Sequence, residues 1–397
     1  MRIAKFFGAF LITAIIIFGF VLGWNWKSFS VFIDNREALI EGNEWIIKTS
    51  SLRGLSEFMG ENPQYTSVVS IVTDHPDSSI HYNEYEPRVM GTSANILLLA
   101  AYSIQFDLGE LSPNTNIPWS DISIYQLPDV DESVHRGSFR TATNRGWISD
   151  GSISLHNALR LLAEYNDLAL ADYLWWNLGP DIWSRVKDDL QLNLTEMPLP
   201  FSGLYLAISP EFQNQPVDQI IETWEMAESS DWREHVTALS GNFAEISEHR
   251  DAIISYMTRN RLGNSFIEER NAMILFPKTT AAELAGMLLR LVNGEVVNEN
   301  VSRQLMDYLR WPMDRQTGIE MDFTDYGAIY DNRMGLMNGF DFGTSAYTGD
   351  TTVQAFFLDQ LPIGFWFHAS GGHMHQDFMQ RLIYDPALIT QMKRVIQ

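Results

Sequence analysis

The order of strand-like and helix-like segments limits the folds open to this chain of 397 residues. Residues 66–74 and 78–85 are rich in β-branched residues and predict a hairpin. Further strands are expected at 339–347, 351–359 and 363–370, whereas most of the sequence between the two groups has helical spacing. This order predicts an α/β (α+β) fold in which an antiparallel sheet is flanked by helices and interrupted by an inserted helical region.

An apolar run from Phe6 to Trp24 follows Arg2 and Lys5 near the N-terminus. At about 1.5 Å per residue, a helix of this length just crosses a hydrocarbon core of roughly 30 Å. Positive residues before the run favour a cytoplasmic N-terminus, so the remaining chain is expected outside the cytoplasm, in the periplasm or at the cell surface. A cleaved signal peptide is the alternative, although no small-x-small cleavage pattern follows the run. We therefore expect a membrane anchor in 1–27, a connecting helical segment in 28–62 and a globular domain in 63–397.

Composition argues against several functional classes. Fifty acidic residues against 27 basic ones give a net charge of −23, which would repel nucleic acid over most of the surface. The sequence has no cysteine, which removes thiol nucleophiles and thiolate metal sites. His368, His373 and His375 lie close together, but their spacing matches no zinc pattern. We therefore expect no metal, no cofactor and no nucleic-acid partner.

Three local strings carry the strongest indication of chemistry. In "GTSANILLLAAY", Gly91 to Tyr102, two hydroxyl residues precede a strongly apolar helix. The string "LRLLAEY" is followed by Asn166 and Asp167 and then by a second helix, and "GFDFGTSAY" predicts a strand near the C-terminus. A hydroxyl at a helix N-terminus becomes a nucleophile when a base takes its proton and donors stabilise the developing oxyanion.

The order of these strings resembles the serine β-lactamase and penicillin-binding protein (DD-peptidase) superfamily, especially class A-like serine hydrolases, from about Thr66 to Pro386. That family carries S-x-x-K at the start of a helix, S-D-N in a loop between helices and K-T-G on a strand. The resemblance places the first motif on Thr92, Ser93, Ala94 and Asn95, and the second on Asn166, Asp167 and Leu168. The third falls on Phe342, Gly343 and Thr344.

All three motifs lack side chains that the chemistry needs. Neither reading frame of the first motif supplies an amine, and no lysine lies between Lys48 and Lys187 or between Lys278 and Lys393. The second motif lacks its serine and its asparagine, and Asp167 is equally well explained as the N-cap of the next helix. The resemblance also implies a glutamate before the helix predicted in "TTAAELAGMLLRLVNGE", which ends at Gly294, and Glu268 is a candidate that misses the family spacing.

Three hypotheses follow from this pattern. The first is a membrane-anchored, catalytically impaired pseudoenzyme that binds a cell-envelope peptide or partner protein in its cleft. The second is an active serine hydrolase, a β-lactamase, D-Ala-D-Ala carboxypeptidase or esterase, in which Ser93 uses Asp167, Glu268 or His135 as its base. The third is an envelope scaffold without a cleft function. The first and second predict that Thr92 and Ser93 lie near both the Asn166 to Leu168 loop and the Phe342 to Thr344 strand.

Overall fold

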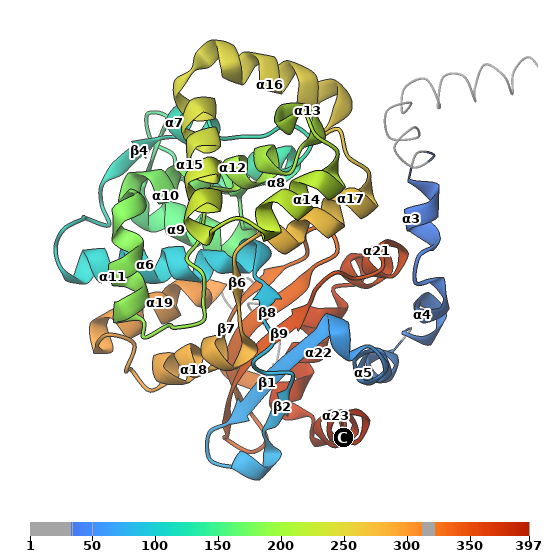
Figure 1. Ribbon diagram of the computed structural model, residues 1–397. Helices are drawn as coiled ribbons and strands as arrows, with labels where there is room; N and C mark the ends of the chain where they lie inside the picture. The colour runs from blue at the N-terminus through green and yellow to red at the C-terminus, as the bar shows by residue number, and fades with distance from the viewer. Residues whose placement is uncertain (1–32, 34, 50, 312–321, 397) are drawn as a thin grey trace, which may run out of the picture.

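The computed structural model describes residues 33, 35–49, 51–311 and 322–396, so the proposed anchor at 6–24 lies outside the described residues. Within these ranges, no helix is both long enough and apolar enough to cross a bilayer. The predicted architecture is confirmed, because one antiparallel sheet is covered by helices on both faces and a helical region is inserted between its strands (Figure 1).

The sheet has five strands in the order β2-β1-β9-β8-β7, so its first and last strands in sequence pair at its centre. Strands β1 and β2 form the expected hairpin, with Val69 opposite His81. Central β1 pairs with β9 over its whole length, from Thr66 opposite Leu358 to Val72 opposite Thr352. The strands are β1 (Thr66–Val72), β2 (Ile80–Tyr82), β7 (Phe323–Asp331), β8 (Met337–Ser345) and β9 (Thr351–Leu358).

Alternation along the strands divides the apolar residues between two cores. Val68 and Phe356 face one core, and their neighbours Val69 and Phe357 face the other. Because side chains of a strand point to opposite faces in turn, a sheet with two covered faces needs apolar residues in both registers. The first core holds α3 (Arg36–Ile40), α4 (Asn43–Lys48), α5 (Leu52–Glu61), α21 (Ile363–Gly371), α22 (Met374–Tyr384) and α23 (Pro386–Val395) against the sheet.

The other face is covered by three helices, of which α6 is the most deeply buried. Every residue of α6 from Asn95 to Gln105 is buried. In α18, the Thr280 side chain accepts a hydrogen bond from the Glu283 N–H and so caps the start of the helix. These three helices are α6 (Asn95–Asp107), α18 (Ala281–Val292) and α19 (Glu299–Leu309).

The inserted helical region lies between α6 and α18 and stands beside the sheet (Figure 1). One small antiparallel pair, β3 (Arg88–Val89) with β6 (Lys278–Thr279), joins the segment before α6 to the segment before α18. A second, β4 (Asn116–Pro118) with β5 (Ser152–Ser154), lies within the inserted region. Its helices are α7 (Trp119–Ser123), α8 (Glu132–Asn144), α9 (Leu155–Tyr165), α10 (Leu168–Leu178), α11 (Trp183–Asp189), α12 (Phe201–Ala207), α13 (Pro210–Gln213), α14 (Val217–Glu225), α15 (Ser229–Glu245), α16 (Ser247–Asn260) and α17 (Phe266–Ala272).

Two expectations for the C-terminal strands need correction. The apolar stretch at 363–370 is not a strand but most of helix α21, which begins after Pro362. Its continuous apolar character reflects burial, which helices and strands share. Strand β7 was not expected at all, although it forms an edge of the sheet.

Candidate functional site

Thr92 and Ser93 lie in a short 3-10 turn, Gly91–Ala94, that leads directly into α6. Gly91 has a φ of +55°, and a Cβ at this position would lie 2.0 Å from Oδ2 of Asp331. Glycine therefore allows the end of β7 to approach the start of the central helix, which brings the Asp331 carboxyl to the motif hydroxyl.

The Thr92 hydroxyl donates to Oδ1 of Asp331 over 2.5 Å, and both side chains are buried. Burial raises the pKa of Asp331, while Arg333 and the Thr92 hydroxyl act in the opposite direction. A carboxylate is a far weaker base than an amine, whose ordinary pKa is about 10. The Thr92 hydroxyl thus contacts a carboxyl group and not an amine.

Ser93 lies beside Thr92 but turns away from the cleft. Its hydroxyl donates to the Met90 carbonyl over 2.5 Å, and none of the side chain is exposed. Of the bases that the hydrolase hypothesis offers to Ser93, Asp167 and His135 form an ion pair with each other. The geometry therefore gives Ser93 a structural contact and no general base among the described residues.

Two asparagines occupy the centre of the motif network. The Asn95 amide donates to Oδ1 of Asn166 over 3.0 Å, and the Asn166 amide donates to the Tyr330 carbonyl over 2.5 Å. Asn166 has a φ of +50°, a conformation that asparagine tolerates better than most residues. Amide contacts thus join the central helix, the α9–α10 loop and β7, which the structure brings together at one place.

Arg333 follows β7 and binds the same loop. Its guanidinium donates to Oδ1 of Asp131 over 2.8 Å and to the Asn166 carbonyl over 3.2 Å. Although burial opposes it, the charges of Asp131 and Asp331 hold the pKa of Arg333 above its ordinary value. Burial raises the pKa of Asp131 to about 6, against the opposing charge of Arg333. The charge of Arg333 is therefore balanced by the two buried carboxyl groups of Asp131 and Asp331.

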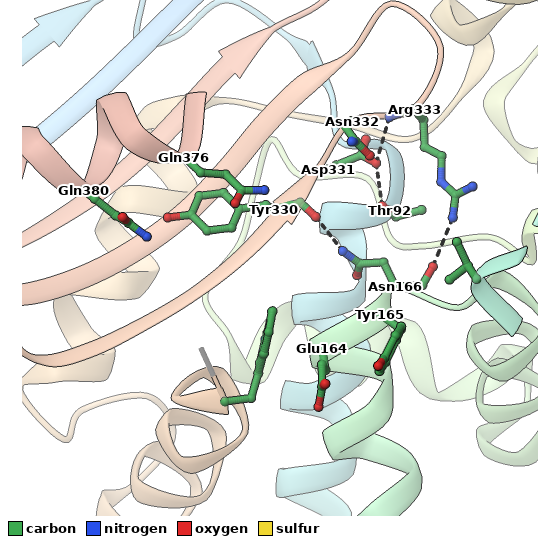
Figure 2. A pocket seen from close by; sticks show the side chains of 12 residues that line it. Thr92, Glu164, Tyr165, Asn166, Tyr330, Asp331, Asn332, Arg333, Gln376 and Gln380 are labelled. Carbon is green, nitrogen blue, oxygen red and sulfur yellow. Dashed lines mark hydrogen bonds between the residues drawn. The ribbon is translucent and has the colours of Figure 1, made fainter. Parts of the chain in front are cut away.

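A cavity of about 390 Å³ opens over this network, between the start of α6, the end of α9, the end of β7 and α22 (Figure 2). Among its lining residues in the described ranges, Arg333 is the one basic side chain and no lysine is present. The side chains of Asn332 and Gln376 line the cavity, and among the described residues no hydrogen bond engages them. The lining residues are Thr92, Val134, Glu164, Tyr165, Asn166, Trp311, Tyr330, Asp331, Asn332, Arg333, Gln376 and Gln380.

The predicted third segment does not lie at this cavity. Phe342, Gly343 and Thr344 are on β8, where Phe342 pairs with Gly327, and Phe342 and Thr344 line a different cavity beside Asp74. The prediction is wrong because β7 was missed: the strand that reaches Thr92 is β7, with Tyr330 and Asp331 at its end.

Glu268 also lies apart from the lining residues of the cavity. It is the third residue of α17, and its carboxylate accepts from the backbone N–H of Ser265 in a capping box. This contact satisfies N–H groups that have no partner within the helix, so the capping box accounts for Glu268 without a role in substrate binding.

Asp167 caps α10, as one prediction had it, by accepting from the Leu170 N–H. Its carboxylate also lies 2.9 Å from Nδ1 of His135, whose Nε2 lies 2.9 Å from the Ser123 hydroxyl. Sequence reasoning singled out His135 and Asp167 but missed Ser123, since no local spacing links a residue of α7 to the α9–α10 loop. In the described ranges, no group of three or more histidine, aspartate or glutamate side chains could hold a metal ion.

Comparisons with solved structures show similarity to β-lactamases. The β-lactamase from Sphaerobacter thermophilus DSM 20745 shares 12% identity, with a TM-score of 0.48 over 87% of this chain and 94% of that one. A class A β-lactamase of the last common ancestor of Gram-negative bacteria shares 15% identity, with a TM-score of 0.45 over 82% of this chain and all of that one. No family model and no curated protein matches the sequence.

The fold rests on the arrangement of the chain itself. The sheet order and the helical region between its two groups of strands agree with the predicted architecture. Of the three predicted motif segments, the first two meet at the cavity, through Thr92 and Asn166, and Asp331 of β7 completes the group. The chain has the predicted α/β (α+β) architecture, and β7, rather than the segment assigned to the third motif, reaches the Thr92 cavity.

Proposed function

We propose that this protein is a membrane-anchored, extracytoplasmic β-lactamase-like pseudoenzyme whose cleft binds a cell-envelope peptide or partner protein without acylation. The single observation that carries the proposal is the pairing of the Thr92 hydroxyl with the Asp331 carboxyl in a cavity whose described lining residues include no lysine. A hydroxyl without a suitable base is a weak nucleophile, and loss of general base catalysis costs typically 10²- to 10⁴-fold in rate.

Binding is supported by the polar groups that remain at the cavity. Asn332 and Gln376 line it, and Tyr330 contributes an aromatic wall (Figure 2). Arg333, the basic lining residue, is already bonded to Asp131 and lies beside Asp331. A carboxylate ligand would have to compete with these buried acids, so the cleft favours uncharged amide groups, such as the backbone of a peptide.

The extracytoplasmic location follows from the sequence alone. The apolar run from Phe6 to Trp24 and the preceding Arg2 and Lys5 support an anchor with a cytoplasmic N-terminus. Fractionation of cells that express the full chain tests this part. Recovery of the uncleaved protein in a soluble fraction without detergent would contradict it.

Incubation with a fluorescent penicillin, followed by intact-mass measurement, tests the chemistry. No adduct should form on the wild-type protein. An adduct that disappears in Ser93→Ala would establish Ser93 as a nucleophile, and one that disappears in Thr92→Ala would establish Thr92. Asn95→Lys alone should not restore acylation, because its neighbours Asn166 and Asp331 do not reproduce the other two motifs.

Titration with peptidoglycan stem peptides, monitored by calorimetry, tests binding. Asn332→Trp should fill the mouth of the cleft and abolish binding, because Asn332 is exposed at its rim. Asn300→Trp is the matched control, since Asn300 is an exposed asparagine on α19 and does not line the cavity. Equal loss in both variants, or binding unaffected by Asn332→Trp, would argue against the cleft as the binding site.

A further inference from the structure

Ser123, His135 and Asp167 form a hydrogen-bonded chain outside the Thr92 cavity. The Ser123 hydroxyl lies 2.9 Å from Nε2 of His135, and Nδ1 of His135 lies 2.9 and 3.1 Å from the two carboxylate oxygens of Asp167. The three residues come from the end of α7, the first turn of α8 and the N-cap of α10. These distances are those of nucleophile, base and orienting acid in a serine hydrolase triad.

The exposure of the three side chains increases from the acid to the base to the hydroxyl, as it does in a catalytic triad. Asp167 is fully buried, His135 is 7% exposed and Ser123 is exposed. A buried carboxylate that accepts from Nδ1 fixes the tautomer in which Nε2 of the neutral imidazole can accept a proton. Burial lowers the pKa of His135, but the hydrogen bond and charge of Asp167 outweigh it, so this pKa lies above its ordinary value. The imidazole is therefore a stronger base than an isolated histidine.

We propose that Ser123 is the nucleophile of a second site that cleaves small activated esters with an apolar acyl or aryl group. Ser123 Oγ attacks the acyl carbon, and Nε2 of His135 takes the hydroxyl proton. The bond from the acyl carbon to the leaving oxygen breaks, and His135 returns the proton to that oxygen. Water, deprotonated by His135, then attacks the acyl-serine ester and releases the carboxylic acid and the free hydroxyl.

The surroundings of Ser123 define this substrate class. The Trp119 ring stacks on His135, with centroids 5.3 Å apart, and lies 5.2 Å from the ring of Phe139. Phe139 is 41% exposed, so an apolar surface lies beside the base. Ser123 is the last residue of α7, and the carbonyl end of a helix does not stabilise an oxyanion. The leaving group must therefore be a good one, such as a phenolate.

Ser123 also lies 3.1 Å from the Trp119 carbonyl, a contact that a purely structural serine would make. Labelling of the full chain with an alkyl fluorophosphonate, followed by peptide mapping, separates the two roles. We expect an adduct at Ser123 that is absent in Ser123→Ala. Ser120 is the matched control, because it is exposed on the same helix but its hydroxyl contacts Asp121 rather than a histidine. Ser120→Ala should leave labelling unchanged.

Two further variants test the base. His135→Ala should slow labelling by about 100-fold or more. Asp167→Asn should also slow it while the fold is kept, because asparagine is as good an N-cap as aspartate. Release of p-nitrophenol from p-nitrophenyl butyrate should follow the same order among the variants. Equal labelling of Ser120 and Ser123, or a labelling rate unchanged by Asp167→Asn in a folded protein, would overturn the proposal. The penicillin experiment on the Thr92 cleft is independent of this result.

Discussion

Thr92 and Ser123 are two hydroxyls whose hydrogen-bond networks reach the same loop, Asn166 to Leu168, yet their surroundings differ in every respect that matters for reactivity. Thr92 stands at the motif position, is buried and donates to a carboxyl group. Ser123 stands outside any motif, is exposed and contacts an imidazole that a buried carboxylate orients. The comparison shows that a place in a motif does not make a nucleophile, because the reactivity of a hydroxyl depends on its hydrogen-bond partner.

The two networks should also differ in their contribution to stability. The network around Thr92 joins the central helix, the loop and β7 through buried polar contacts, whereas Ser123 closes its network at the surface. Substitutions on the Thr92 side should therefore lower the free energy of unfolding, and substitution of Ser123 should not. Four predictions test this difference, in order of decreasing effect.

Arg333→Met should lower the free energy of unfolding by about 3–5 kcal/mol, because it leaves Asp131 and Asp331 buried without their cation. Urea unfolding followed by tryptophan fluorescence measures the loss. Arg381→Met is the control, since the Arg381–Asp377 ion pair is exposed and should be worth less than about 1 kcal/mol. If Arg333→Met lowers the free energy of unfolding no more than this control does, the Thr92 network does not stabilise the fold.

Asp341→Asn should remove a pH dependence of the free energy of unfolding. Asp341 lies on β8 beside Tyr330, which lines the cleft. Burial raises the pKa of Asp341 to about 8 from an ordinary value of 3.8, and the carboxyl accepts from the Tyr330 hydroxyl. The unfolded chain loses this proton first as pH rises, so the wild type loses stability from about pH 4 to about pH 8. The variant should lack this loss of stability, which is on the order of 1 kcal/mol of unfolding free energy per pH unit. Parallel pH profiles for both proteins would refute the prediction, and Asp377→Asn at an exposed site is the control.

Thr92→Val should lower the free energy of unfolding by about 1–2 kcal/mol. Valine keeps the shape of threonine but leaves Oδ1 of the buried Asp331 without the hydroxyl donor. The measurement is again the urea midpoint. A variant as stable as the wild type would show that the hydrogen bond between Thr92 and Asp331 does not hold β7 against the central helix.

Ser123→Ala should change the free energy of unfolding by less than about 0.5 kcal/mol, the usual range for an exposed substitution. The same variant should abolish labelling by the fluorophosphonate. Thermal unfolding of the purified variant measures the first quantity. A loss above about 1.5 kcal/mol would mean that Ser123 is a structural residue, and the contrast with Thr92 would then disappear.

Much of the fold could be predicted because its signals are local. Alternating β-branched residues gave the β1–β2 hairpin, and an apolar run after two hydroxyl residues gave α6. The α9–α10 loop was found from the break in helical spacing at Asn166 and Asp167. Each of these features needs only the residues of the segment itself.

The features that could not be predicted depend on contacts between segments far apart in the sequence. Residues 363–370 are apolar on all sides because α21 is buried, so their pattern could not separate helix from strand. Strand β7 was missed, although Tyr326, Ile329 and Tyr330 are of the aromatic and β-branched types that favour strands. The assignment of the third motif to Phe342 to Thr344 then followed from that omission. The contact between Ser123 and His135 joins α7 to α8 through side chains alone, so no periodic pattern in the sequence predicts it.

The pairing of β1 with β9 has a consequence for the order of events during synthesis. Arg88 and Asp359 form a buried ion pair although 271 residues separate them, and the central ladder of the sheet spans a similar distance along the chain. Strand β1 leaves the ribosome early but meets its main partner only when nearly the whole chain has been made. Contacts between residues so far apart form slowly, because loop-closure entropy must be overcome first. The nascent chain therefore carries an apolar strand with no partner on the β9 side for most of its synthesis, at a time when aggregation competes with folding.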